Sequence, residues 1–405
     1  MLAYGALVWW PRSELQMAIT KLGRFQRLAL SATSGCMRTT PTAAMEIALQ
    51  ILPLDLHIQQ EAALAAIRLM VLDLWGKNHY SSHTVILNRA IEYQPLIAAP
   101  CDRITNQLIF NKKYLIQLRE EEQDQSPLNE LRIYTDGSKT GCGSGAGIFS
   151  FDLNINIHLP LGTQSTIFQC ECVALTEAAR AVQRMGVNDF YIKLISDSAS
   201  VLMALGNENT NSKLILECHE ALEAIALTNR VTLQWIKGHS GSLGNDAADE
   251  LARRGSGMIP AGPHPLLPLP FSLVRTWIRQ RSTVLQNQRW SRSVDCKQSK
   301  MALPAVNPQL TKRLLNLNRT NLKTIIGTIT GHCLLNKHLF VLGATDSPLC
   351  RGCFSAEESV THVVLECEAV ANQRTKILGT VRSLREACEV PGRLLCFWKE
   401  LGWLN

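Results

Sequence analysis

Four carboxylates in apolar surroundings between residues 131 and 254 constrain this chain more than any other feature. Asp136 and Asp197 each end an alternating apolar run that is typical of a β-strand. Glu171 and Asp249 lie in helical patterns among small and apolar residues. Burying several carboxylates without compensation costs several kcal/mol for each, so we expect these side chains to share a cation. Oxygen ligands of this kind favour Mg²⁺ or Mn²⁺.

Each of these residues also has a simpler interpretation when it is taken alone. Asp136 could form a turn before a glycine, and Asp197 could cap a following helix. Glu171 and Asp249 could be exposed residues on helix surfaces. All four together, in this order of strand, helix, strand and helix, favour a metal site instead. Two cations about 3.5–4 Å apart can clamp the attacking water and the leaving oxygen of a phosphodiester, so the pattern predicts a nuclease or polymerase site.

The motifs TDGS, a helical Glu, SDS, and GHSG followed by ND and ADELA occur in an order that resembles ribonuclease H. The resemblance covers residues 131–254 and implies a mixed α/β layer, in which helices pack on a five-stranded sheet whose first three strands are antiparallel. It also implies hydrolysis of the RNA strand of RNA/DNA hybrids with two Mg²⁺ or Mn²⁺ ions. Asp136 would bridge both ions. Glu171 and Asp197 would bind one ion, and Asp249 would bind the other.

Further residues acquire roles only through this resemblance. His239 matches a mobile histidine that helps turnover, although a lone loop histidine is usually not catalytic. Backbone groups and small side chains near Gly137, Ser138 and Asn245 would recognise the 2′-hydroxyls of the RNA strand across the minor groove. We also expect the glycines of GSKTGCGSGAG to allow close approach of a substrate to the backbone.

The N-terminal part of the chain is expected to be mostly helical. Its segments YGALVWWP and TTPTAAMEIALQILPLD resemble the stretch between the polymerase thumb and the ribonuclease H domain in non-LTR retrotransposon reverse transcriptases of the arthropod type. A Tyr/Phe-x-Asp-Asp polymerase motif is absent from the sequence. The resemblance therefore implies a truncated, retrotransposon-derived protein without its polymerase. We predict a helical remnant of the thumb and connection at 1–125, a ribonuclease H domain at 130–255, a Pro-rich linker at 256–270 and a basic helical region at 271–405.

Basic residues are concentrated in the region after the linker. Residues 271–325 contain eleven Lys or Arg and a single acid, Asp295. Such an excess suits a nucleic-acid backbone, although a solvated helix surface would have the same composition. Trp277 and Trp290 lie among these arginines and could stack on bases or anchor a core. The expected partners are RNA/DNA hybrids and other nucleic acids.

The C-terminal region carries the segment CRGCFSAEESVTHVVLEC at 350–367, with the spacing C-x₂-C-x₈-H-x₄-C. Three thiolates and one imidazole can complete a tetrahedral Zn²⁺ site. A redox-active Cys pair is the alternative, and we favour zinc because no thioredoxin-like strand precedes the pair. The motif also resembles the C-terminal Cys/His motif of the same retrotransposon family. The predicted zinc ligands are Cys350, Cys353, His362 and Cys367.

Cysteine usage and the N-terminus indicate a reducing compartment. The chain has 13 cysteines, an odd number scattered along its length, which argues against a secreted disulfide framework. The apolar run at 1–10 lacks a basic segment and a small-residue cleavage site, and it is too short to span a bilayer. We therefore expect a nuclear or cytoplasmic protein that is not secreted and has no membrane partner.

The sequence thus favours an RNA-cutting endonuclease, and two other functions stay open. One is a nucleic-acid-binding remnant whose carboxylate site persists but is catalytically idle. The other is a protein-interaction scaffold built on the helical N-terminal region. The intact carboxylates favour the enzyme, whereas the basic stretch fits the enzyme and the binding remnant equally.

Overall fold

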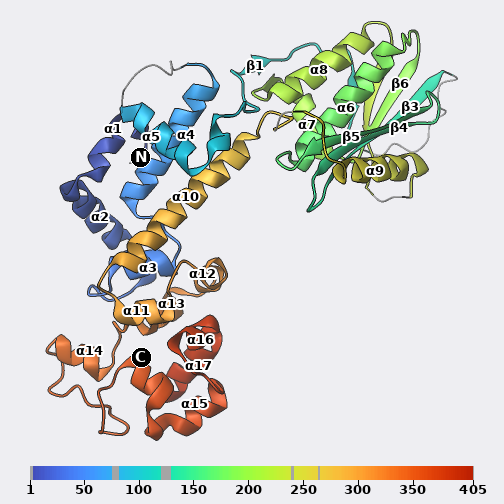
Figure 1. The fold of residues 1–405 in the computed structure, drawn as a ribbon. Coiled ribbons are helices and arrows are strands. Elements are labelled where there is room, and N and C mark those ends of the chain that lie inside the picture. The colour runs from blue at the N-terminus through green and yellow to red at the C-terminus, as the bar shows by residue number, and fades with distance from the viewer. Residues whose placement is uncertain (1–2, 75–81, 120–128, 239–240, 263–264, 405) are drawn as a thin grey trace. The chain divides into compact units, whose positions relative to one another are not determined.

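The computed structural model describes residues 3–74, 82–119, 129–238, 241–262 and 265–404 (Figure 1). The chain divides into two compact units, each with a hydrophobic core of its own. The sheet unit comprises residues 67–79 and 90–276, and the helical unit comprises residues 1–66, 80–89 and 277–405. Among the residues that the structure describes, no helix is long and apolar enough to cross a membrane.

A six-stranded mixed sheet forms the centre of the sheet unit. Its strands lie in the order β2-β8-β6-β3-β4-β5, with β4 antiparallel to both β3 and β5 and all other neighbours parallel. The predicted mixed α/β fold with three antiparallel strands first is confirmed, and β2 adds a sixth strand at the edge beside β8. The strand bounds are β2 Leu115–Gln117, β3 Glu130–Lys139, β4 Ser144–Ser150, β5 Ile155–Gly162, β6 Tyr191–Ser196 and β8 Arg230–Trp235.

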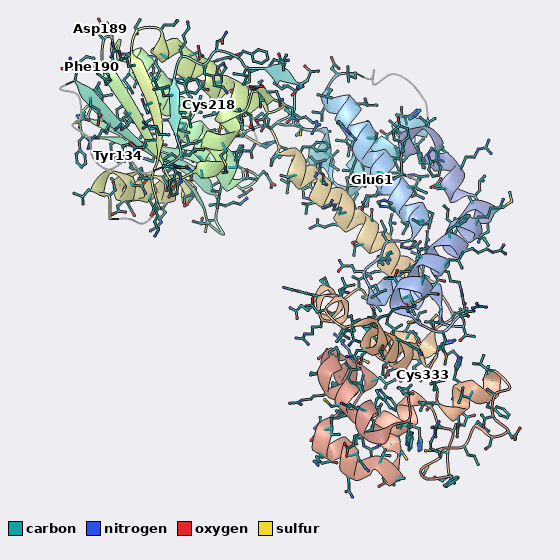
Figure 2. All side chains as sticks on the ribbon, turned by 180° about the vertical axis from the view of Figure 1, so that it is seen from behind. Glu61, Tyr134, Asp189, Phe190, Cys218 and Cys333 are labelled. Carbon is teal, nitrogen blue, oxygen red and sulfur yellow. The ribbon has the colours of Figure 1, made fainter. Side chains whose placement is uncertain are left out.

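Helices cover both faces of this sheet. Gly137 of β3 lies against one helix, α6, whereas Tyr134 lies against Gly244 of another, α9 (Figures 1 and 2). Side chains an odd number of positions apart on a strand point to opposite faces, so α6 and α9 pack on opposite sides. The bounds in this unit are η2 Pro95–Ala98, α6 Ile167–Arg184, α7 Ala199–Gly206, α8 Lys213–Ala226 and α9 Leu243–Ser256.

Two glycines of β4 determine how closely α9 approaches the sheet. A Cβ atom on Gly145 would lie 2.4 Å from the backbone nitrogen of Ser256, and one on Gly147 would lie 2.1 Å from the carbonyl oxygen of Ala248. No side chain fits at either position, so the backbone of α9 rests directly on the strand. We predicted that these glycines let a substrate approach the backbone. For Gly145 and Gly147 this prediction is wrong, because the helix α9 occupies that space.

The core of the sheet unit forms where α6, α7 and α8 pack on the sheet. Apolar residues of β3, β6 and α6 are completely buried there, among them Ile133, Leu194 and Leu175. The helix α6 begins with a capping box, in which the side chains of Thr166 and Gln169 each accept a hydrogen bond from the other's backbone N–H. Packing and capping together fix the position of this helix over β3.

Residues before the first long strand also belong to this unit. The short strand β1 (Gln107–Leu108) pairs antiparallel with β7 (Asn209–Thr210). Upstream of it, the carboxylate of Asp102 accepts hydrogen bonds from Ser212 Oγ at 2.9 and 3.0 Å and from the backbone N–H of Leu214 at 3.1 Å. Asp102 therefore caps α8 from a distant part of the chain.

The segment predicted as a Pro-rich linker, residues 256–270, makes contacts with the same unit. Leu269 forms a parallel β-bridge with Cys101. The amide of Gln169, at the start of α6, donates a hydrogen bond to the carbonyl of Pro268 at 2.9 Å. The end of this segment is thus held by contacts with Cys101 and with the start of α6.

The helical unit contains residues from both ends of the chain. Leu30 and Met45 belong to the same buried cluster as Trp290 and Trp398, because the apolar faces of short helices need a partner to be buried. The regions predicted at the two ends therefore share one core. The bounds are α1 Ala6–Trp9, η1 Trp10–Glu14, α2 Gln16–Ser34, α3 Thr42–Ala48, α4 Leu54–Val71, α5 Ser82–Tyr93, α10 Phe271–Arg292, α11 Lys297–Ala302, α12 Pro308–Leu315, α13 Arg319–Thr330, α14 Asn336–Val341, η3 His362–Glu366, η4 Glu368–Val370, α15 Ala371–Ile377, α16 Leu384–Glu389 and α17 Pro391–Leu401.

Part of the basic stretch has a structural role. Arg289 forms a bidentate pair with the buried Asp55, with N–O distances of 3.0 and 2.6 Å. Lys300 and Arg313 each donate to a backbone carbonyl. These cations serve the fold and are not free for a phosphate backbone. Arg275, Arg279 and Arg292 of α10 are exposed.

Trp290 belongs to the core and does not present its ring to a base. It is buried, and its indole N–H donates a hydrogen bond to the carbonyl of Leu303 at 2.8 Å. Of the two interpretations that the sequence leaves open for this residue, the structure selects the core anchor.

Candidate active site

Asp136 and Asp197 lie side by side because their strands are parallel neighbours. Thr135 of β3 pairs with Ser196, the last residue of β6, so the next residue along the chain is Asp136 in one case and Asp197 in the other. Asp136 is 7% exposed. The indole N–H of Trp235, at the end of β8, donates to the carbonyl of Asp197 at 2.9 Å and fixes its backbone.

Glu171 reaches the same place from α6. A Cβ atom on Gly137 would lie 2.7 Å from the backbone nitrogen of Glu171, so the glycine allows β3 and α6 to touch. One carboxylate oxygen from each of Asp136, Glu171 and Asp197 lies within 4.8 Å of the others. Three of the four predicted ligands are therefore close enough to hold one ion.

Burial and mutual repulsion disfavour the ionised form of these carboxylates. Burial, and then the charges of Asp197 and Asp249, raise the pKa of Asp136 to about 7. Burial and the charge of Asp136 raise the pKa of Glu171 well above its ordinary value. Among the described residues, Oε2 of Glu171 is buried and has no hydrogen-bond partner. An orphaned buried oxygen between two further carboxylates fits a divalent cation.

Asp249, the fourth predicted ligand, lies at the edge of this cluster. It comes from α9, and a hydrogen bond with its side chain contributes to the raised pKa of Asp136, after burial and the neighbouring charges. It is not one of the three carboxylates whose oxygens lie within 4.8 Å of one another. Its Oδ2 instead lies 2.7 Å from Nη2 of Arg253.

The residues predicted to bind substrate occupy different positions. Gly137 faces Glu171, and Ser138 follows it on β3, where it pairs with Gly145. Asn245 lies in the first turn of α9 and is almost completely buried, and its Oδ1 has no hydrogen-bond partner within the described part of the chain. His239 lies outside the described residues.

Sequence reasoning missed two residues that position Asp197. One is Trp235, whose hydrogen bond is given above. The other is Gly238, where a Cβ atom would lie 2.6 Å from Oδ2 of Asp197. A glycine directly before the GHSG histidine was the available signal, since glycine marks places where two groups approach closely.

The sheet and the carboxylate cluster define a mixed α/β protein with a site of the kind that holds divalent cations. Comparison with known proteins gives the family. The RNase H family model matches residues 129–257. Ribonuclease H of Cupriavidus metallidurans is 30% identical over 143 residues, which are 33% of this chain and 99% of that protein. The chain belongs to the ribonuclease H family and is an enzyme of that class.

Two further relatives are similar over nearly as many residues. Ribonuclease H of Ruthia magnifica subsp. Calyptogena magnifica is 29% identical over 140 residues, covering 31% of this chain and 94% of that protein. Ribonuclease H of Orientia tsutsugamushi is 26% identical over 140 residues, covering 31% of this chain and 81% of that protein. In each case the similarity covers about a third of the present chain.

The helical unit contains a second group of possible metal ligands. The ligand atoms of Cys350, Cys353, His362 and Cys367 all lie within 4.8 Å of one another. Cys350 Sγ is 3.7 Å from Cys367 Sγ, and Cys353 Sγ is 3.2 Å from His362 Nε2. Hydrogen bonds from Ser355, and then from His362, lower the pKa of Cys353 to about 6. Three sulfurs and one imidazole nitrogen gathered in this way fit a Zn²⁺ ion.

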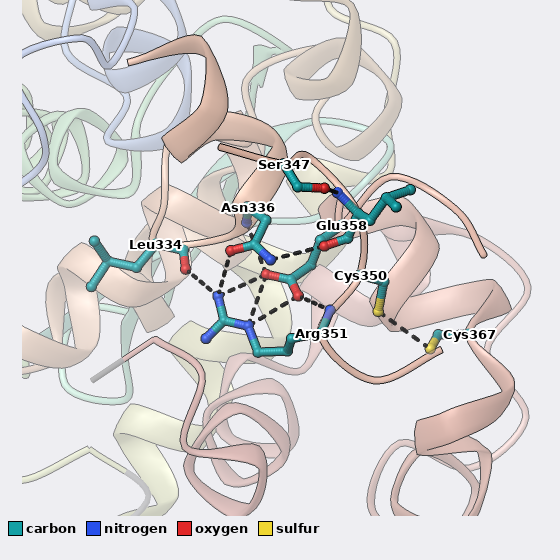
Figure 3. A network of polar contacts seen from close by, with 8 residues as sticks. Leu334, Asn336, Ser347, Cys350, Arg351, Glu358 and Cys367 are labelled. Carbon is teal, nitrogen blue, oxygen red and sulfur yellow. Dashed lines mark hydrogen bonds and ion pairs between the residues drawn. The ribbon is translucent and has the colours of Figure 1, made fainter. Parts of the chain in front are cut away.

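A buried ion pair supports the first two cysteines (Figure 3). Glu358 is completely buried and accepts hydrogen bonds from the Nε, Nη2 and backbone N–H of Arg351, which stands between Cys350 and Cys353. It also accepts from the backbone N–H of Asn336 at 2.8 Å. The Cys-x-x-Cys turn is thereby fixed to the start of α14. By contrast, Cys333, labelled in Figure 2, lies in the apolar core outside this group.

Proposed function

We propose that this chain cuts the RNA strand of RNA/DNA hybrids endonucleolytically by a two-metal-ion mechanism. The observation that carries the proposal is the group of three carboxylates, Asp136, Glu171 and Asp197, with one oxygen of each within 4.8 Å of the others. Asp136 lies within β3, Asp197 directly follows the parallel strand β6, and Glu171 lies on the helix α6 packed over them. Membership of the ribonuclease H family supports the same substrate.

Each carboxylate has a distinct part in this proposal. Asp136 occupies the centre, where it contributes to both ion positions. Glu171 and Asp197 complete one position, and Asp249 completes the other. Two Mg²⁺ or Mn²⁺ ions held there would activate a water and stabilise the departing 3′ oxygen. Because the pKa of Asp136 is raised to about 7, the cluster needs added positive charge to be fully ionised at neutral pH.

Discrimination between RNA and DNA rests on groups beside this cluster. The 2′-hydroxyl is both donor and acceptor, so it can be recognised by backbone groups near Gly137 and Ser138. Asn245, in the first turn of α9, is proposed to add a further contact to the RNA strand. His239 is proposed to assist proton transfer or product release.

The helical unit is proposed to add metal and nucleic-acid binding. Zn²⁺ would be bound by the four residues of the Cys/His group, and exposed arginines of α10 would contact phosphates. The regions predicted at 1–125 and 271–405 would then be parts of a truncated retrotransposon protein. Their resemblance to the retrotransposon reverse transcriptases supports this origin. The described residues between 90 and 119 are not helical remnant as predicted, because they belong to the sheet unit and contribute β1 and β2.

Cleavage of a labelled RNA/DNA hybrid with Mg²⁺ tests the proposed activity. Asp136→Asn keeps the side-chain shape and removes the central charge, so cleavage should fall by orders of magnitude while hybrid binding is retained. Asp189→Asn is the matched control. Asp189 precedes β6 at the end opposite Asp197, and its φ of 64° suits asparagine, so this variant should cut like the wild type.

The outcomes separate the enzyme from the binding remnant. Equal cleavage by wild-type and Asp136→Asn proteins would show that the carboxylate site is not the active site. Hybrid binding without any cleavage by the wild type would favour the idle remnant. Single-stranded RNA and duplex DNA should be poor substrates. Asp249→Asn should reduce cleavage less than Asp136→Asn, and Mn²⁺ should partly restore it, since Mn²⁺ binds such oxygen sites more tightly.

A further inference from the structure

Arg253 forms an ion pair with one of the four predicted metal ligands. Its Nη2 lies 2.7 Å from Oδ2 of Asp249, one helical turn earlier on α9. The side chain of Asp249 is 20% exposed and that of Arg253 is 56% exposed. A largely exposed guanidinium is thus paired with Asp249 beside the carboxylate cluster.

Asp249 is at the same time part of the electrostatic environment of that cluster. Burial and the charge of Asp197 are followed by the charge and the hydrogen bond of Asp249 among the causes that raise the pKa of Asp136. The charge of Asp249 also contributes to the raised pKa of Glu171, after burial and the charges of Asp136 and Asp197. Asp249 therefore interacts both with the carboxylate of Asp136 and with the guanidinium of Arg253.

The backbone of α9 has no freedom to change this arrangement. Cβ atoms on Gly147 and Gly145 would lie 2.1 and 2.4 Å from backbone atoms of Ala248 and Ser256, so the helix already touches β4. Asp249 lies between these two contacts along the helix. Any adjustment that accompanies cation binding must therefore come from side chains, and the long side chain of Arg253 has the most room.

Building on the two-ion function proposed above, we infer that Arg253 is a positioning residue that competes with the cation for Asp249. In the metal-free cluster the guanidinium is the counter-ion of this carboxylate. A divalent cation beside Asp249 displaces it, because two positive charges at one carboxylate repel each other. An exposed pair between residues four apart on a helix is weak, so the exchange is easy.

This competition sets the cation concentration at which the site fills. Arg253 does not touch the reacting atoms, so it changes the affinity for the ion and leaves the rate of the filled site unaltered. Arg254 is the natural comparison. Arg254 carries the same charge at the next position of the helix. Successive residues are rotated by about 100° around the helix axis, so the side chain of Arg254 points in a different direction from that of Arg253.

Mg²⁺ binding to the chain of residues 1–405, measured by calorimetry, tests the inference. Arg253→Gln should bind Mg²⁺ about three- to tenfold more tightly than the wild type, and the half-activating Mg²⁺ concentration should fall by the same factor. Its kcat at saturating Mg²⁺ should equal that of the wild type. Arg254→Gln and Arg253→Lys should keep the wild-type affinity, since one leaves the competing charge untouched and the other retains it.

Two results would overturn the inference. One is the same Mg²⁺ affinity in Arg253→Gln and wild type, and the other is equal tightening by Arg254→Gln, which would show a general charge effect. Asp136→Asn should abolish the heat of Mg²⁺ binding. This control shows that the heat comes from Mg²⁺ binding at the carboxylate cluster. A wild-type protein that binds Mg²⁺ without cutting hybrid would refute the proposed function, while the calorimetric comparison would still decide the role of Arg253.

Discussion

The backbones of Gly137 and Glu171 touch, with only 2.7 Å between the amide nitrogen of Glu171 and the place where a Cβ on Gly137 would stand. This contact joins β3 to α6 at the level of the carboxylates. It brings Glu171 from a helix to the strand that carries Asp136. The geometry of the cluster therefore depends on a position that has no side chain.

Gly137→Ala is expected to damage both stability and activity. The added methyl group would also meet Cβ of Cys170 at 2.9 Å, so α6 must move away from β3. Overpacking of this kind costs about 1–3 kcal/mol, and the displacement would separate Glu171 from Asp136. Denaturant unfolding and hybrid cleavage measure the two effects.

Gly141→Ala is the control for this substitution, because a Cβ at Gly141 meets no atom within 4 Å. It should unfold and cut hybrid like the wild type. The contact argument would be contradicted if the two alanine variants behaved alike.

The sequence allows the carboxylate site to be anticipated, and particular residues explain why. Asp136 and Asp197 each come after an apolar run with regular alternation, and parallel neighbouring strands place such positions side by side. The strand β3 does not end at Asp136 as predicted but continues to Lys139, because it goes on pairing with β4. The glycines of β4 were misinterpreted for a physical reason. A glycine indicates that something approaches the backbone, but Gly145 and Gly147 do not say whether a substrate or a helix does so.

Other features could not be read from local patterns. The strand β2 has only three residues, which is too short for an alternation to be recognised. The shared core of Leu30 with Trp398 depends on contacts between residues far apart in the sequence. An amphipathic helix shows that it needs a partner and does not identify that partner.

The metal-free protein should lose stability as the pH rises from about 4 to about 7. Burial and neighbouring charges raise the pKa of Asp136 from its ordinary value of 3.8 to about 7, so the folded state holds a proton that the unfolded state releases. The contribution is complete below pH 4 and is lost as Asp136 ionises in the fold. The loss is on the order of a few kcal/mol, at about 1.4 kcal/mol per pKa unit.

The difference between wild-type and Asp136→Asn proteins isolates this effect. Denaturant unfolding in a chelator should give Asp136→Asn the greater stability at pH 8 and a smaller dependence on pH. Saturating Mg²⁺ should reverse the order at pH 8, because a ligand of the folded state stabilises it. Parallel pH profiles for the two proteins would rule out the ionisation of Asp136 as the cause.

Asp102→Ala should destabilise the sheet unit although it lies well before the ribonuclease H motifs in sequence. The carboxylate accepts from Ser212 Oγ and from the N–H of Leu214, so its removal leaves the N–H of Leu214 unpaired and no longer holds Ser212, whose Oγ caps α8. Loss of a helix cap costs about 0.5–2 kcal/mol. Thermal unfolding of Asp102→Ala, Ser212→Ala and the double variant measures the coupling. Because the two residues share hydrogen bonds, the losses should be less than additive, and strict additivity would contradict the capping role.

Glu358→Gln should release zinc from the helical unit more readily without affecting hybrid cleavage. Glu358 is completely buried and holds Arg351 between Cys350 and Cys353, so losing its charge frees the turn that presents two thiolates. Breaking a buried pair costs about 3–5 kcal/mol, and we expect a smaller loss of about 2–3 kcal/mol because Arg351 is partly exposed. Glu357→Gln is the matched control, since its pair with Lys337 is on the surface and is worth at most about 1 kcal/mol. Transfer of zinc to a chromogenic chelator compares the two variants. Equal transfer rates, or no zinc in either protein, would refute the supporting role of Glu358.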